Sequence, residues 1–261
     1  MAGFRDKVVW ITGASSGIGE ALAIAWSREG SRVVLSARNE AELERVRRLC
    51  AGPERHLVKP LDVGDGDAVA DAASQVLGEI GHVDILVHSA GVSQRAMAAD
   101  TDLAVDRQIM EINYFGAIAL TKALLPSMLA RRSGHIVPIS SVIGHVGVPL
   151  RSAYAASKHA LHGFFNTLRA ETHKHGIRVT IVCPGYIRTN VSENALRGDG
   201  TRHGKLDETH ARAMLPERAA PAILRGVAGE RNEVYVGGRE TLAIPLQRHF
   251  PRLVSRLVRV K

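Results

Sequence analysis

A glycine-rich turn between a buried strand and an amphipathic helix constrains the fold of this chain more than any other feature. Residues 7–12 form a short apolar run typical of a buried strand. The turn from Gly13 to Gly19 follows at once, and apolar residues then recur at helical spacing over residues 20–29. Gly13 permits a tight turn, Gly17 lets the backbone approach a pyrophosphate, and Gly19 allows the helix to pack closely on the strand. This strand–turn–helix pattern predicts a dinucleotide site with the phosphates at the helix N-terminus.

The same alternation continues along the chain. Strands are predicted near residues 7–12, 32–36, 55–59, 83–88, 135–140, 177–182 and 233–236, and helices near 17–30, 39–50, 65–78, 102–131, 151–174 and 216–228. Short apolar strands between amphipathic helices indicate βαβ units and a parallel sheet covered on both faces. A length of 261 residues suits one large domain. We therefore predict a single α/β domain over 1–261, a Rossmann-type doubly wound parallel sheet of about seven strands with helices on both faces.

Arg38 indicates which dinucleotide binds. Folds of this kind that bind NAD place an acid about 20 residues beyond the glycines to hold the ribose 2′-hydroxyl. Here the second strand runs into Ala37-Arg38-Asn39, and no acid precedes Arg38 on that strand. A guanidinium matches a 2′-phosphate with a charge-assisted fork. Arg38 therefore favours NADP(H). The alternative is that Arg38 is a surface residue at the end of a strand with no role in binding a cofactor.

Tyr154 and Lys158 form a pair suited to proton transfer. Residues at i and i+4 share one helix face. A cation beside a phenol favours the phenolate, so we expect the pKa of Tyr154 to fall toward neutral pH. Such a tyrosine can pass a proton to or from an alcohol oxygen. Alone, the pattern fits a solvated helix face better than a catalytic pair, but here it does not occur alone.

Several short motifs occur together, in an order and spacing that are far more specific than any one of them. They are Thr12 to Gly19, Leu61-Asp62-Val63, Ala90-Gly91, Asn113, Ser141, Tyr154-x-x-x-Lys158 and Pro184-Gly185-x-x-x-Thr189. With them the chain resembles the short-chain dehydrogenase/reductase (SDR) family over nearly its whole length. Three further stretches, 35–38, 92–95 and 157–165, resemble the member 7/7B-like branch of that family.

The resemblance implies a catalytic set of four residues. Tyr154 would be the general acid/base, and Lys158 would lower its pKa and bind the nicotinamide ribose. Ser141 would hydrogen-bond the substrate oxygen, and Asn113 would hold a water that links the lysine to solvent. The cofactor-binding residues implied are Gly13, Ser15, Ser16, Gly17, Ile18, Gly19, Arg38, Asp62, Val63, Ala90, Gly91, Tyr154, Lys158, Pro184, Gly185, Ile187 and Thr189. Among these, Asp62 would bind the adenine amino group, and Ile187 with Thr189 the carboxamide.

The run after the fourth strand departs from the family pattern. The family has Asn-Asn-Ala-Gly after the fourth strand, whereas this chain has His88-Ser89-Ala90-Gly91. The second asparagine normally braces the central strands. Because a serine has fewer hydrogen-bonding groups than an asparagine, we expect Ser89 to reduce that bracing.

Two segments are specialised. Residues 186–213 are polar and include Gly198 and Gly200, which fits a mobile substrate lid or an ordinary polar excursion. The C-terminal extension, 239–261, includes a basic amphipathic helix predicted from residue 247 onward. Its apolar stripe consists of Phe250, Leu253, Val254, Leu257 and Val258, and its basic side of Arg248, Arg252, Arg256, Arg259 and Lys261. Such a helix can contact an anionic membrane peripherally, or pack on its own subunit or on a partner.

Composition limits the remaining alternatives. The net charge is +8, yet aromatic residues are only 4% and no nucleic-acid motif occurs, so we expect no nucleic-acid partner.

Cys50 and Cys183 are isolated in sequence, which suggests a reducing compartment. No signal peptide is evident, and we expect a cytoplasmic protein, membrane-associated if the C-terminal helix binds lipid. Six histidines, His135, His145, His159, His162, His173 and His175, are joined by no cysteine or carboxylate cluster at ligand spacing, so we expect no metal site.

The sequence thus predicts an NADP(H)-dependent oxidoreductase that moves a hydride between the nicotinamide and a carbonyl or secondary alcohol. The family resemblance favours a lipophilic ketone, steroid or retinoid-like substrate and a homodimer or homotetramer. A pocket with apolar residues Val146, Val148, Pro149 and Leu150 agrees with lipophilicity. A 3-oxoacyl thioester is the alternative substrate. A non-catalytic cofactor-binding scaffold or peripheral membrane protein is the alternative of another class, and the intact set Ser141, Tyr154, Lys158 and Asn113 argues against it.

Overall fold

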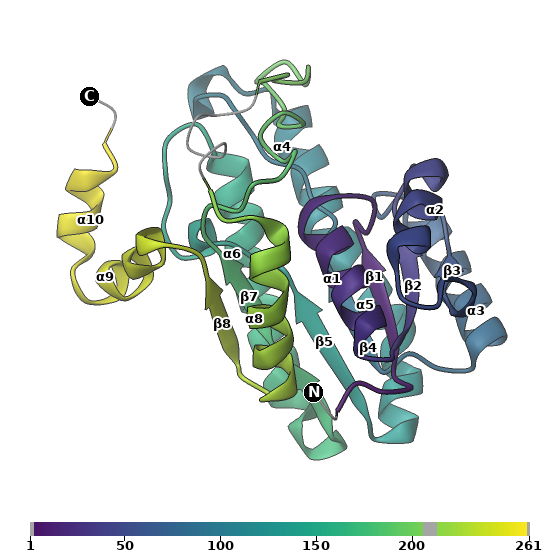
Figure 1. Cartoon of the computed structure of the whole chain (residues 1–261). Helices are drawn as coiled ribbons and strands as arrows, with labels where there is room; N and C mark the ends of the chain where they lie inside the picture. Colours follow the sequence, from purple (N-terminus) through teal and green to yellow (C-terminus); the bar gives the residue numbers. More distant parts are fainter. Residues whose placement is uncertain (1–2, 206–212, 260–261) are drawn as a thin grey trace.

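A parallel sheet lies at the centre of the computed structural model, which describes residues 3–205 and 213–259 (Figure 1). Within those ranges six strands pair in the order β3-β2-β1-β4-β5-β6, all parallel. Their bounds are β1 Val8–Thr12, β2 Arg32–Ser36, β3 Leu57–Val58, β4 Ile85–His88, β5 Gly134–Pro138 and β6 Ile177–Val179. The chain reverses direction across the sheet between β1 and β4, which is where doubly wound sheets bind their ligands.

The predicted strand 177–182 is two strands, which corrects the predicted sheet of about seven. After β6 the chain changes partner at Thr180, whose N–H still donates to Ile136 of β5 at 3.0 Å while its hydroxyl donates to the Arg231 carbonyl at 2.6 Å. The next strand, β7 (Ile181–Pro184), then pairs in parallel with β8 (Glu233–Val236) as a separate two-stranded sheet.

Helices cover both faces of the sheet, as predicted (Figure 1). One face packs against α1 (Gly17–Arg28), α2 (Glu40–Leu49) and α8 (Pro216–Ala228), with Trp26 fully buried in that core. The other face packs against α3 (Gly66–Ile80), α5 (Gly116–Arg131) and α6 (Ser152–Thr172), with Phe165 fully buried. Short helical turns lie in several of the connections: η1 Pro53–Arg55, η2 Ala98–Asp100, η4 Val142–Gly144 and η5 His173–His175.

The long helix predicted over 102–131 contains a π-helical turn. It consists of α4 (Leu103–Met110), the π turn η3 (Glu111–Phe115) and α5. Such turns insert one extra residue per turn and occur frequently at functional sites. By length and composition this segment is the one described helix that could cross a membrane. In this fold it packs against the body, α4 on α6 and α5 on α3.

The C-terminal extension forms two short helices in place of the predicted continuous one. After η6 (Arg239–Leu242), α9 covers Ala243–His249 and α10 covers Pro251–Leu257. Proline disfavours helical backbone in the residue before it, and Phe250 adopts a non-helical conformation at that point. The pair projects from the body (Figure 1). Val254 is buried, whereas Phe250, Leu253 and Leu257 are exposed.

Candidate active site

One cavity of about 1470 Å³ lies beyond the carboxyl ends of the central strands and gathers most of the predicted site residues. All the predicted cofactor-binding residues except Gly19 line it, and so does Ser141. Asn113 and Gly19 lie behind its wall. Gly19 packs against the Gly13 carbonyl, where a side chain would collide with the backbone.

The glycine loop has the backbone conformation that the sequence predicted. Gly13 and Gly17 have φ angles of +68° and +56°, a region that other residues rarely adopt. A Cβ atom at Gly13 would lie 2.7 Å from the Ala90 nitrogen, and one at Gly17 would lie 2.8 Å from Thr189 Cγ2. Helix α1 begins within this loop, and the first N–H groups of a helix attract phosphate.

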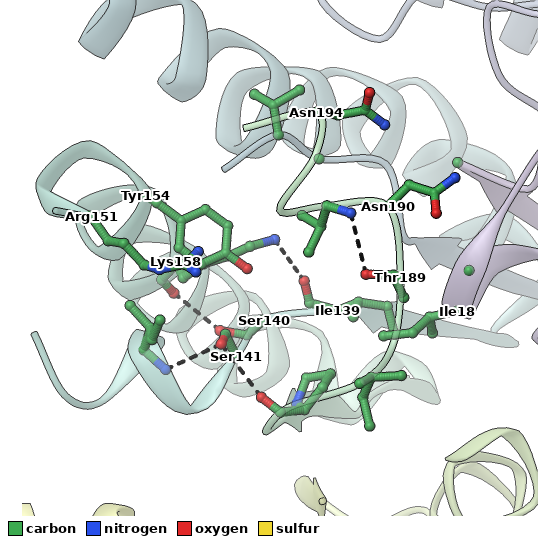
Figure 2. A pocket seen from close by; sticks show the side chains of 18 of the residues that line it. Ile18, Ile139, Ser140, Ser141, Arg151, Tyr154, Lys158, Thr189, Asn190 and Asn194 are labelled. Atoms are coloured by element: carbon green, nitrogen blue, oxygen red, sulfur yellow. Dashed lines mark hydrogen bonds between the residues drawn. The ribbon is translucent and has the colours of Figure 1, made fainter. Parts of the chain in front are cut away.

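Tyr154 and Lys158 extend from the first turns of α6 toward the cavity, one turn apart (Figure 2). The Lys158 ammonium lies 5.6 Å from the centroid of the Tyr154 ring and donates a 2.9 Å hydrogen bond to the Ile139 carbonyl. Ser141 follows β5; its hydroxyl contacts the Pro184 carbonyl at 3.4 Å and accepts from the Ile143 N–H at 3.2 Å. The three side chains therefore face one part of the cavity from two adjacent elements.

The pKa of Tyr154 differs from the value expected from the sequence. Burial raises the pKa of Tyr154 above its ordinary value, even though Arg151 and the Ser141 hydroxyl act in the lowering direction. Burial also lowers the pKa of Lys158 to about 8. The prediction that the pKa of Tyr154 falls considered the cation alone, and removal of the phenol from water outweighs that effect.

Asn113 lies in the π turn η3 and fixes the chain next to Lys158. Its side-chain oxygen accepts from the Val92 N–H at 2.8 Å, and its nitrogen donates to the Val92 carbonyl and to Ser157 Oγ, both at 2.9 Å. A Cβ atom at Gly91 would lie 3.1 Å from Asn113 Oδ1 and 3.6 Å from Lys158 Nζ. Asn113 and Lys158 thus converge on one glycine at the end of the fourth strand.

Arg38 lies where the sequence placed it, at the end of β2 on the cavity wall. Its side chain is 63% exposed, and Nη1 lies 3.9 Å from Asp62 Oδ2. The guanidinium is therefore accessible to a ligand and is held only by a loose surface ion pair.

The strands near Ser89 are braced by another residue. The Thr12 hydroxyl accepts from the Ala90 N–H at 3.3 Å and contacts the Val87 carbonyl at 3.4 Å, which joins β1 to the end of β4. His88 is buried, with Nε2 2.8 Å from Thr121 Oγ1, and burial lowers its pKa to about 3.

The substrate side of the cavity includes residues that the sequence analysis missed. Arg151 is buried, its guanidinium carbon lies 5.9 Å from the Tyr154 ring centroid, and it donates to Ser93 Oγ. Its i, i+3 and i+7 spacing with Tyr154 and Lys158 is the signal that could have found it. Further lining comes from the apolar loop Val146, Val148, Pro149 and Leu150, from Asn190, Asn194, Arg202 and His203 of the predicted lid, and from Leu246, Val254 and Leu257 near the C-terminus. Lid residues 206–212 lie outside the described residues.

The doubly wound sheet, the glycine turn after β1 and the Tyr–Lys helix after β5 define a nicotinamide-dependent oxidoreductase. The chain belongs to the short-chain dehydrogenase/reductase family, since residues 7–199 match the family described as short chain dehydrogenase. It is 45% identical over 97% of its length to the bovine (Bos taurus) dehydrogenase/reductase SDR family member 7B, covering 81% of that protein. It is 48% identical over 88% of its length to the SDR family protein 7-like of Anopheles gambiae, covering 74% of it. These relatives place it in the 7/7B-like branch, whose family acts on CH–OH groups.

Solved structures agree with this assignment. A short-chain dehydrogenase from Streptomyces avermitilis has a TM-score of 0.83 at 32% identity, with 97% of this chain and 96% of that one covered. A short-chain dehydrogenase from Burkholderia cenocepacia, solved in complex with NADP, has a TM-score of 0.82 at 25% identity, with 99% of each chain covered.

Proposed function

We propose that the protein is an NADP(H)-dependent oxidoreductase that interconverts a lipophilic ketone and its secondary alcohol, a molecule of the steroid or retinoid kind. The observation that carries the proposal is the meeting of Tyr154, Lys158 and Ser141 with the glycine loop in one cavity. The apolar loop 146–150 and the apolar residues of the C-terminal helices make the substrate side suitable for a hydrocarbon skeleton.

The cavity wall fits a dinucleotide. The glycine loop lines the cavity and helix α1 begins at Gly17, so the first N–H groups of that helix are available to a phosphate group. Arg38 offers a guanidinium to a 2′-phosphate, whereas an acid there would repel it. The nicotinamide, when bound, supplies or accepts the hydride. Ile187 and Thr189, after β7, would hold its carboxamide.

The protein residues then handle the proton. The Ser141 hydroxyl would hold the substrate oxygen, and Tyr154 would give that oxygen its proton or take it away. Burial raises the pKa of Tyr154, so the phenol carries its proton at neutral pH and can give it to a carbonyl oxygen once its pKa is lowered by a neighbouring positive charge. Lys158, partly charged near its pKa of about 8, would favour the phenolate formed as the proton leaves.

The test compares Tyr154→Phe with a matched control, Tyr114→Phe, whose ring packs against Phe115 and Phe164. The wild type is screened with NADPH against ketones, aldehydes and 3-oxoacyl thioesters, and the best substrate is carried forward. We expect Tyr154→Phe to lower kcat by about 10²–10⁴-fold with the NADPH dissociation constant nearly unchanged. Tyr114→Phe should keep wild-type turnover. Turnover of Tyr154→Phe within twofold of the wild type rejects the role of Tyr154, and a clear preference for the thioester rejects the substrate class.

A further inference from the structure

A second cluster of reactive side chains lies behind the active-site serine. His145 comes from the turn after η4, His162 from α6 and Cys183 from β7. One ligand atom of each lies within 4.8 Å of the other two. Cys183 Sγ is 3.6 Å from His145 Nε2 and 3.9 Å from His162 Nε2. The sequence expectation of no metal site considered spacing along the chain, and Cys183 joins the histidines only through the fold.

The distances are close to those of a tetrahedral metal site. Zinc–sulfur bonds of about 2.3 Å and zinc–nitrogen bonds of about 2.0–2.1 Å place sulfur and nitrogen ligands roughly 3.5 Å apart. The two sulfur–nitrogen distances exceed that value by only a few tenths of an ångström. The two imidazole nitrogens lie within 4.8 Å of each other, and rotation of the histidine side chains toward Cys183 would complete three corners of a tetrahedron.

Glu233 of β8 orients this cluster. Its Oε1 lies 3.5 Å from His162 Nδ1, and its Oε2 lies 3.8 Å from His145 Nε2 and accepts a 2.6 Å hydrogen bond from the Tyr235 hydroxyl. A carboxylate at Nδ1 favours the tautomer with the proton there, which leaves the lone pair of His162 Nε2 facing Cys183. Metal-binding histidines commonly have such a carboxylate partner.

The Cys183 sulfur lies next to two imidazole nitrogens at once, one from each histidine. A thiol has one proton and can donate it to only one of the two nitrogens. His162 Nε2 also lies 2.9 Å from Ser140 Oγ, and that hydroxyl also reaches the Lys158 carbonyl at 3.3 Å. A cation between the three ligand atoms would engage both imidazoles and the sulfur at once.

We propose that His145, His162 and Cys183 bind a divalent cation of the zinc class, with Glu233 orienting His162 and water as the fourth ligand. On binding, the Cys183 thiol loses its proton to solvent as the sulfur–metal bond forms, and the imidazoles bind in their neutral forms. Soft sulfur with imidazole selects zinc and similar transition metals over magnesium or calcium. The ion would fasten the separate β7–β8 pair to α6 and to the turn after β5.

The experiment uses the full chain after treatment with a chelator, titrated with Co²⁺ and then challenged with Zn²⁺. We expect one cobalt ion per chain, the visible bands of tetrahedral cobalt, a thiolate-to-cobalt charge-transfer band in the near ultraviolet, and displacement of both by zinc. Cys183→Ala should remove the charge-transfer band and weaken cobalt binding by roughly a hundredfold or more. The control Cys50→Ala, at the other buried cysteine, should leave both unchanged.

Two further variants keep the test decisive if the Cys183 variant does not fold. His145→Gln, at the end of the short turn η4, should also weaken cobalt binding by roughly a hundredfold. Glu233→Gln should keep the charge-transfer band and weaken binding by about 10–100-fold, as expected for a residue that orients a ligand. Cobalt binding by the wild type without a charge-transfer band, or affinities of both ligand variants within threefold of the wild type, overturns the proposal. These readouts do not depend on turnover and are separate from the proposed function.

Discussion

Replacing Arg38 with glutamine should remove the preference for NADPH over NADH. A hydrogen bond to a charged group contributes about 1.5–3 kcal/mol. The guanidinium already has a loose surface ion pair with Asp62 at 3.9 Å, and giving up such a pair costs about 0–1 kcal/mol. The difference, roughly 0.5–3 kcal/mol, corresponds to a roughly 2- to 160-fold weaker NADPH complex.

The assay is a fluorescence titration of the wild type and variants with NADPH and NADH at low and high salt. Arg48→Gln, an exposed arginine on α2 away from the cavity, is the matched control and should bind both cofactors as the wild type does. NADH affinity of Arg38→Gln should change by less than threefold. The wild-type preference should shrink as salt screens the phosphate contact. An equal loss of affinity for both cofactors, or a wild type that binds them equally, would refute the assignment of Arg38.

Two other predictions concern stability and association. His88 is buried with its pKa lowered to about 3, so the unfolded chain binds one more proton than the native state between that value and an ordinary histidine pKa near 6.5. Stability is therefore lost as pH falls through this window, and the folding equilibrium constant drops about fifteenfold from pH 6.5 to 5. Urea unfolding of His88→Asn should show a flatter dependence of stability on pH than the wild type, and parallel pH profiles would contradict the assignment to His88. Phe250, Leu253 and Leu257 are exposed, and burying such apolar side chains lowers the free energy. Changing all three to serine should therefore lower either the oligomer mass in solution or the salt-sensitive binding to anionic vesicles. If neither property changes, the C-terminal helices cover only their own subunit.

The parts of the fold that the sequence predicted follow from local rules. The strand at 7–12 and the turn at Gly13 depend on an apolar run and on glycines that adopt positive φ, so neighbouring residues suffice to recognise them. Helix α8 begins at Pro216, where a proline fits the first turn, and its predicted bounds match the structure.

The features that the sequence did not reveal depend on partners distant in sequence. Thr180 ends a strand because its hydroxyl reaches Arg231, and no pattern within 177–182 reveals that partner. The π turn at Asn113 keeps an apolar helical pattern, so periodicity does not show the extra residue. The meeting of Cys183 with His145 likewise arises only when β7 lies against the turn after β5.

The Tyr154–Lys158 pair shows the same limit in its energetics. Spacing on one helix face correctly placed the two side chains together, but it could not supply the burial that sets their pKa values. Burial raises the pKa of Tyr154 and lowers that of Lys158, so each neutral form is favoured more than in water. An ammonium has three N–H donors; the bond from Lys158 to the Ile139 carbonyl anchors the side chain and leaves donors for a ribose hydroxyl. We therefore expect cofactor binding to strengthen the charged form of Lys158 and, through it, to bring the pKa of Tyr154 down toward the value that the sequence alone suggested.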